Sequence, residues 1–474
     1  MRIKNLIVFI ALFIAFAGKG QDFSYDQKIG AQAAQQVEQM MGTYPDSLLN
    51  AYVSQVGYRL VEGLGNIPFE FQFRVVDMPE PNAFALPGGY VYVSRGILSL
   101  MNNEDELAGV MGHEMVHVTK RHSIKQMKQG ILPGLLRIPG ALIGGLVNED
   151  LGRIINAPVN FGSALFLSSY SRKQERESDE LGIKLAAEAG YDPGKLSVIL
   201  ESLAREMENE SGEEEKKSYF SSHPYTPKRV VDIEEKAPLI SWEPKAPIAD
   251  QEGMFGKLDG MVVGPNPAQG IFRENLFLHP DLDIAMTFPE KWETLNVPVA
   301  VAAIQTDGNA QMFMGADDPT KDPDSLGLAF AGALEENYKI QPSQNKSIDV
   351  NGFPGHVVAF KDLSGKAPVD IQLYWIKTSQ VMINILGMGY TAYSTALSNA
   401  VMSLRSLSDE EKASITAIHI RIVEATAGES LQSLSERAEN EWDVETTALM
   451  NGLAQDAPLQ EGTLVKIARK EAYP

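Results

Sequence analysis

The first part of the chain combines helical and extended hydrophobic patterns. Residues 24–64 carry apolar side chains at helical spacing, interrupted by Gly42 to Pro45, and this predicts two helices. The segment FEFQFRVV, 69–76, alternates apolar and polar positions and predicts a strand. In NAFALPGGYVYVS, a short extended stretch and the strand 90–94 flank a Pro-Gly-Gly turn at 87–89. We therefore expect two helices followed by a small sheet.

Longer helices are predicted beyond this sheet. Residues 103–129 form one helix, whose acidic first turn suits the positive end of the helix dipole. A second helix covers 170–189 and ends at Gly190, and a third covers 193–209. The sequence HPYTPKRVVDIEEK begins a further helix. This part of the chain is therefore predicted to be mainly helical.

The pattern changes after a Pro-rich stretch near residue 240. Strand-like runs dominate from Gly270, and the tail from Ile415 reads strand, helix, helix, strand. We expect an α+β protein with a signal peptide at 1–20, a first domain at 21–268, an α+β accessory domain at 269–408 and a small βααβ module at 409–474.

The N-terminus, MRIKNLIVFIALFIAFAGKGQ, predicts a secretory signal peptide. Arg2 and Lys4 precede an apolar run at 6–17, which ends in an Ala-x-Ala site. A membrane-spanning helix needs about 20 apolar residues, and this run is shorter. The chain has no cysteine, which excludes disulfides, thiolate catalysis and a lipid-modified N-terminal cysteine. We expect an exported protein in a bacterial periplasm.

Charge and hydropathy exclude some partners. The formal net charge is −21, from 41 Lys and Arg against 62 Asp and Glu, so a nucleic acid backbone would be repelled. General solubility is the simplest role of this charge. Residues 130–147, GILPGLLRIPGALIGGLV, are apolar but interrupted by Pro, Arg and Gly, which argues against a membrane span. A lid or a peripheral membrane contact are the alternatives for this segment.

The motif HEMVH, His113 to His117, lies in the middle of the helix predicted at 103–129. The two histidines are about 40° apart around the helix, so both imidazoles reach one point, as a metal pair requires. Glu114 is offset from them and is placed to act as a general base beside Zn²⁺. Two ordinary histidines on a half-buried helix are the alternative. His122 is five residues beyond His117, about 140° around a continuous helix, and is predicted to be structural.

Catalytic zinc usually has a third protein ligand. Lys120 and Ser123 stand where a metzincin would carry its Gly and third His, so that class is excluded. The later segment SRKQERESDELG offers Glu175 and Asp179 four residues apart on one helix face. Glu175 can ligate, and Asp179 can accept the outer N–H of a ligating His. From periodicity alone, a solvated charged helix face remains the alternative.

Three motifs in this order resemble one zinc peptidase family. NAFALPGG, NEDELAGVMGHEMVHV and SRKQERESDELG…AGYDP are similar to the family of the CAAX prenyl protease, the membrane protease HtpX and the periplasmic β-barrel assembly-enhancing protease. The resemblance covers residues 25–236. It implies a gluzincin-type metalloprotease domain, mainly helical with a small sheet, and one Zn²⁺ per chain held by His113, His117 and Glu175. By the same resemblance Glu114 is catalytic and Asp179 supports a ligand.

The resemblance also assigns roles to HPYTPKR. It implies that His223 faces the cleft as a gate or fourth ligand and that Arg229 orients or stabilises oxyanion charge; a loop histidine and a surface arginine are the alternatives. The stretch Asn82, Ala83, Phe84 and Ala85 is expected to be an edge strand to which an extended peptide substrate adds. An ordinary hairpin packed on the core is the alternative.

The appended parts carry weaker resemblances. FLHPDLDIAMTFPEKWETLN resembles the opening of PsbP-like modules, and the tail resembles a LysM module, which implies peptidoglycan as a partner. A degenerate packing module is the alternative for the tail. His279, His356 and His419 have no ligand-spaced companion and are expected to be incidental. The sequence therefore predicts a periplasmic zinc endopeptidase acting on envelope or misfolded proteins. The alternative is a chaperone-like or cell-wall-binding protein with a latent, self-inhibited zinc site.

Overall fold

A computed structural model describes residues 23–65, 67–128, 169–209, 219–363, 367–456 and 458–474. The predicted signal peptide and the apolar segment 130–147 both lie outside the described residues. None of the helices in the described ranges combines the length and hydropathy needed to cross a membrane.

Two helices and a small sheet begin the described chain, as predicted. Helix α2 covers Ser24–Met41 and α3 covers Ser47–Glu62, whose first turn is capped by the Asp46 carboxylate. Strands β1 (Gln72–Val76), β2 (Ala83–Leu86) and β3 (Tyr90–Ser94) form a sheet in the order β1-β3-β2. β3 runs parallel to β1 and antiparallel to β2, so β2 is at one edge of this sheet.

The long helix predicted at 103–129 is two helices. After the short α4 (Arg95–Leu100), α5 covers Glu104–Thr119 and α6 covers His122–Lys128. Arg121 lies between them with φ 56, in the left-handed region, where a continuous α-helix cannot pass. The prediction of one helix was therefore wrong, and the chain changes direction just after the HEMVH motif.

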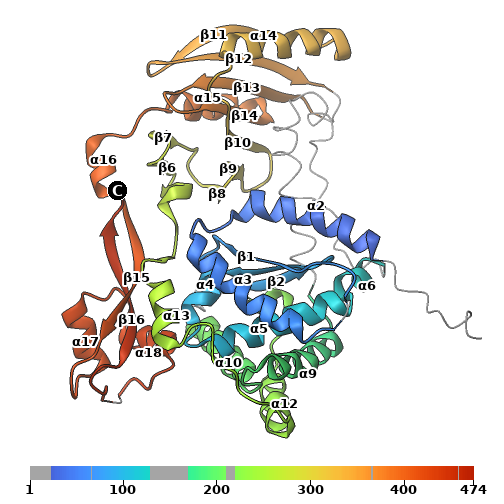
Figure 1. Ribbon diagram of the computed structural model, residues 1–474. Helices are drawn as coiled ribbons and strands as arrows, with labels where there is room; N and C mark the ends of the chain where they lie inside the picture. The colour runs from blue at the N-terminus through green and yellow to red at the C-terminus, as the bar shows by residue number, and fades with distance from the viewer. Residues whose placement is uncertain (1–22, 66, 129–168, 210–218, 364–366, 457) are drawn as a thin grey trace, which may run out of the picture.

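Further helices complete this part of the chain. They are α9 (Arg172–Ala189), α10 (Lys195–Asn209), α11 (Tyr219–Ser222), α12 (Pro227–Lys236) and α13 (Gln251–Leu258). Of these, α9, α10 and α12 lie below the small sheet in Figure 1. Helices α5 and α9 approach closely because two glycines meet at their contact. A Cβ on Gly182 would lie 2.9 Å from the backbone nitrogen of His113, and one on Gly112 would lie 3.0 Å from the carbonyl oxygen of Gly182.

A seven-stranded sheet follows, in the order β11-β12-β13-β14-β10-β9-β8. Its strands are β8 (Trp292–Val297), β9 (Ala300–Gln305), β10 (Ala310–Asp317), β11 (Gln344–Val350), β12 (Phe353–Asp362), β13 (Val369–Lys377) and β14 (Met382–Tyr390). Helix α14 (Pro323–Ala333) contributes to the apolar cluster on one face, and α15 (Ser394–Met402) to a second cluster. A three-stranded sheet, β5 (Ile271–Arg273), β6 (Leu276–His279) and β7 (Ile284–Thr287), packs into that second cluster.

The C-terminal part follows the short α16 (Asp409–Ser414) and has the predicted order of strand, helix, helix, strand. Its elements are β15 (Thr416–Glu424), α17 (Leu431–Ala438), α18 (Val444–Asn451) and β16 (Leu464–Ala472). The short β4 (Val262–Val263) joins this sheet beside β15. The buried Lys466 ammonium donates to the carbonyl oxygens of Ser99 and Met101, at 2.7 Å each, directly before α5.

Candidate metal centre

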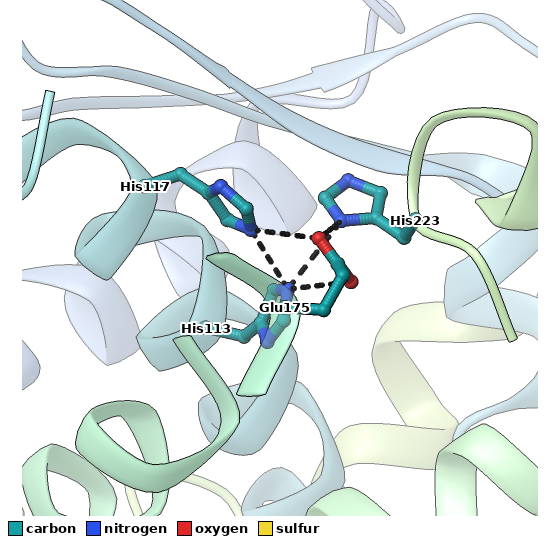
Figure 2. Close-up of side chains that lie close together, drawn as sticks. All are labelled: His113, His117, Glu175 and His223. Atoms are coloured by element: carbon teal, nitrogen blue, oxygen red, sulfur yellow. Dashed lines mark hydrogen bonds and ion pairs between the residues drawn. The ribbon is translucent and has the colours of Figure 1, made fainter. Parts of the chain in front are cut away.

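Four side chains from three segments converge in the helical part of the chain. One ligand atom from each of His113, His117, Glu175 and His223 lies within 4.8 Å of the others (Figure 2). The Nε2 atoms of the two α5 histidines are 3.0 Å apart, and Glu175 Oε1 lies 3.4 Å from His117 Nε2 and 3.3 Å from His223 Nδ1. All four residues are at most 2% exposed. The structure therefore brings together the predicted ligand set and adds His223 to it.

Local structure places each member of the cluster. His113 and His117 are one turn apart on α5, so they share a face. Glu175 lies in the first turn of α9, which is fixed by a capping box between Ser171 and Gln174. His223 directly follows the short α11, and its backbone N–H donates to the Tyr219 carbonyl at 3.1 Å. Two regular helices thus hold three of the four groups, and a loop holds the fourth.

Asp179 and Arg229 form a layer behind the cluster. The Asp179 carboxylate lies 2.9 Å from His113 Nδ1, which leaves His113 Nε2 facing the cluster. The Arg229 guanidinium donates two hydrogen bonds to Asp179, at 2.8 and 2.7 Å, and its Nη1 lies 2.8 Å from Glu175 Oε2. Arg229 is 2% exposed. In this arrangement Arg229 orients the two carboxylates.

Glu114 lies at the cluster without a conventional hydrogen bond. Its side chain is fully buried, and neither carboxylate oxygen has a hydrogen-bond partner among the described residues. His223 Nε2 lies 3.4 Å from Glu114 Oε1. The His223 ring therefore lies between the ligand atoms, which its Nδ1 faces, and the carboxylate of Glu114.

Burial and charge pairing shift the pKa values of the residues at the cluster in different directions. Burial raises the pKa of Glu114, which favours a carboxyl that can take up a proton. Burial also raises the pKa of Glu175, but the neighbouring His223, His117 and His113 outweigh it and hold that pKa well below its usual value. Burial lowers the pKa of His117, so its imidazole is kept neutral and able to ligate.

Two tyrosines that the sequence analysis did not identify enclose the cluster. The Tyr219 ring stacks on the His223 ring at 4.4 Å between centroids and 10° between planes. The Tyr170 ring lies 3.8 Å from the His117 ring, and its hydroxyl pairs with Ser123 Oγ at 2.8 Å. Neither residue carries a sequence signal of its own, because a tyrosine in a helix or loop is usually a packing residue.

The surroundings of His122 differ from the prediction. It was expected to point away from the metal ligands on a continuous helix, but the turn at Arg121 carries its ring back against His117. The Nδ1 atoms of the two rings are 3.0 Å apart, and His122 Nε2 lies 3.5 Å from Glu177 Oε2. When His117 ligates through Nε2, its Nδ1 carries the proton and donates to His122.

The stretch Asn82 to Ala85 lies at the sheet edge. Ala83, Phe84 and Ala85 belong to β2, which packs against α5 and has β3 as its partner among the described residues. Asn82 precedes the strand, and its N–H donates to Ser94 Oγ at 2.9 Å. A small cavity of about 10 Å³ has both Ala85 and His117 in its lining. The strand therefore adjoins the cluster, with its residues buried.

The donor set fits a divalent zinc-type ion. Three imidazole nitrogens and one carboxylate oxygen are the ligand types that zinc prefers. The ligating histidines have outer partners, Asp179 for His113 and His122 for His117, as metal-binding histidines usually do. These buried ligand atoms lie close together, and among the described residues Arg229 is the permanently charged cation that contacts them. This arrangement matches a metal site.

Comparison with known proteins finds a family match for this part of the chain. Residues 47–237 match the protein family described as Peptidase family M48. That range contains all four clustered residues and Glu114. This segment is therefore similar to Peptidase family M48, in line with the resemblance read from the motifs.

Curated relatives match over the same part. Mitochondrial metalloendopeptidase OMA1 of Schizosaccharomyces pombe is 32% identical over 44% of this chain and 60% of that protein. The Escherichia coli β-barrel assembly-enhancing protease is 30% identical over 42% of each chain. Metalloprotease LoiP of Escherichia coli is 30% identical over 35% of this chain and 62% of that one. The chain thus spans less than two thirds of each of these relatives.

The accessory parts gain no assignment from solved structures. The solution structure of cyanobacterial PsbP from Synechocystis sp. PCC 6803 covers 29% of this chain with 10% identity and a TM-score of 0.24. That score is too low to support an argument, so the PsbP-like resemblance stays a prediction, as does the LysM-like one.

Proposed function

We propose that the protein is an exported zinc-dependent endopeptidase that cleaves extended segments of envelope or misfolded proteins. One observation carries this proposal: the buried cluster of His113, His117, Glu175 and His223 has an unbonded carboxylate, Glu114, beside it. A metal site that serves only structure has no use for a second buried carboxylate beside its ligands, because burial of an unpaired charge is unfavourable.

In the proposed site His113, His117 and Glu175 hold one Zn²⁺. The bound ion supplies a Lewis acid for the scissile carbonyl and for the attacking water. Asp179 fixes the tautomer of His113, and Arg229 holds the carboxylates of Asp179 and Glu175 in place. Arg229 is then a positioning residue. The other role that the resemblance offered, stabilising oxyanion charge, would require the Arg229 guanidinium to leave Asp179 and Glu175.

Glu114 acts as the general base. Its raised pKa, caused first by burial, brings the carboxylate closer to the pKa that proton transfer at neutral pH requires. Glu114 takes a proton from the attacking water and delivers it to the leaving amine as the peptide bond breaks. No bond forms between the protein and the substrate in this scheme.

His223 keeps the resting site closed. Its ring occupies the space between the ligand atoms and Glu114, where the water and the scissile bond would have to lie. Because His223 is on a loop, it can leave while the helices hold the other ligands. Turnover then requires a substrate to displace His223, and β2, with Asn82 before it, offers the edge to which an extended chain adds.

The location and the accessory parts complete the proposal. The signal-peptide pattern supports export to the periplasm, and the βααβ order of the C-terminal part supports a LysM-like module that contacts peptidoglycan. The Gly- and Pro-rich segment 130–147 is proposed as a peripheral membrane contact. The accessory domain is proposed to be PsbP-like.

Casein digestion with and without a chelator tests the activity. We expect proteolysis that a chelator abolishes and added zinc restores. Glu114→Gln should retain the metal and lose activity by at least about 100-fold, because general acid–base catalysis contributes that much. A metal-loaded protein that cleaves no unfolded substrate, before and after His223→Ala, would support the chaperone-like alternative instead.

A further inference from the structure

A cavity beside the cluster of candidate metal ligands has an excess of cationic side chains, which is unusual for this acidic protein. It measures about 210 Å³ and is lined by Glu175, a cluster member, together with residues of the first turns of α9 and α12. Four of its eight lining residues are cationic: Arg172, Arg176, Lys228 and Arg229. The chain as a whole carries a net charge of −21, so a cavity lined by four cations is opposite in sign to the chain as a whole.

Pairing does not neutralise this cavity. Of its two acidic residues, Glu175 belongs to the metal cluster and Asp232 accepts from Lys228 Nζ at 2.5 Å. Arg229 is used by Asp179 and Glu175. Arg172 and Arg176 are exposed and form no ion pair with any residue in the described ranges. Two guanidinium groups therefore remain available to a ligand.

The backbone N–H groups also contribute positive potential at this cavity. The first turns of two helices line the cavity, and helix N-termini carry partial positive charge from unpaired N–H groups. The α12 N-cap, Thr226, makes no side-chain capping hydrogen bond, so it does not satisfy the N–H groups of that turn. Side chains and backbone thus both favour an anion at this position.

We propose that this cavity binds a carboxylate of the substrate, so that the enzyme prefers an acidic residue close to the scissile bond. The inference rests on the proposed peptidase function. The cavity is smaller than the roughly 300–1,000 Å³ of pockets for drug-sized ligands, which suits one side chain. Guanidinium groups bind carboxylates with paired hydrogen bonds. Because Glu175 is shared by the cavity and the cluster, a side chain held here belongs to a residue near the cleaved bond.

The test compares peptides that differ by one charge. A quenched fluorescent peptide is prepared with Glu or Gln at each position within three residues of the cleaved bond, and kcat/KM is measured for each pair. We expect one position at which kcat/KM for the Glu peptide exceeds kcat/KM for the Gln peptide by roughly three- to tenfold, mostly because KM is lower. This Glu-to-Gln ratio should shrink in high salt. The same peptide with a free or an amidated C-terminus distinguishes a side-chain carboxylate from a terminal one.

Two double variants complete the test. Arg172→Gln with Arg176→Gln should bring the Glu-to-Gln ratio near one. Lys184→Gln with Lys236→Gln removes the same charge from α9 and α12, the two helices beside the cavity, at positions outside its lining, and should keep the ratio. The proposal is overturned if the Glu-to-Gln ratio of kcat/KM persists in the arginine variant. It is also overturned if this ratio equals one in the native protein.

Binding separates this proposal from the peptidase function. The metal-loaded Glu114→Gln variant is titrated with labelled Glu and Gln peptides, and fluorescence anisotropy gives both Kd values. Tighter binding of the Glu peptide, lost with the two arginines, supports the carboxylate site even if no peptide is cleaved. Equal Kd values for the two peptides refute it, even if the protein proves to be an active protease.

Discussion

The contact between His117 and His122 makes a quantitative prediction for His122→Ala. In the native protein His117 Nδ1 has His122 Nδ1 as its partner at 3.0 Å, and the two residues are 2% and 0% exposed. Removing the acceptor leaves a buried N–H without a partner, which costs about 1–3 kcal/mol. If that cost falls on the metal-bound state, zinc affinity drops by roughly 5- to 150-fold, consistent with the 10–100-fold typical of outer partners of metal ligands.

The assay is competition for zinc against a chromophoric chelator at pH 7.5. His122→Gln, whose side-chain carbonyl can accept from His117, should recover part of the lost affinity, whereas a role in packing alone would give no such recovery. His356→Ala is the matched control, because His356 is also buried and is hydrogen-bonded to Asp324 on α14 and Asn345 on β11. His122→Ala with zinc affinity within twofold of the native protein would refute the reasoning.

Three further predictions concern the cluster and its support. His113→Ala should abolish stoichiometric zinc by metal analysis, and full occupancy would contradict the assigned ligand set. His223→Ala should retain zinc and raise casein hydrolysis, because it opens the space beside Glu114; loss of turnover with zinc still bound would mean that His223 acts in the reaction. Gly182→Ala should force α9 away from α5, lowering the free energy of unfolding by about 1–3 kcal/mol in urea titrations and weakening zinc binding. Gly332→Ala, at an exposed position of α14 with open space around it, is its control and should be neutral or slightly stabilising.

Elements fixed by local signals were predictable from the sequence. The turn at Pro87 to Gly89 separates β2 and β3 as expected, and Gly190 ends α9 in the left-handed conformation. The βααβ order of the tail was read correctly from its periodicity. The same reasoning failed at Arg121, because a non-glycine residue with positive φ leaves no mark in the hydrophobic pattern. That one dihedral angle reversed the prediction for His122.

The site was predictable to the extent that its residues share a helix face. His113 and His117 follow from their spacing alone, whereas Glu175 and His223 needed a family resemblance because no local rule connects segments 48 or more residues apart. The stacking of Tyr219 on His223 and the pairing of Arg229 with two carboxylates arise only from tertiary packing. The cationic cavity between the first turns of α9 and α12 is invisible in the sequence for the same reason.

The buried Lys466 has a consequence for biosynthesis. Its ammonium binds the carbonyl oxygens of Ser99 and Met101, 367 and 365 residues earlier, just ahead of the helix that carries the HEMVH motif. During synthesis the earlier part of a chain emerges and begins to fold first. Those two carbonyls gain their Lys466 partner only with β16, so the lead-in to the motif helix is completed only when nearly the whole sequence has been synthesised. The proposed peptidase activity would then mature late, once the chain is almost complete.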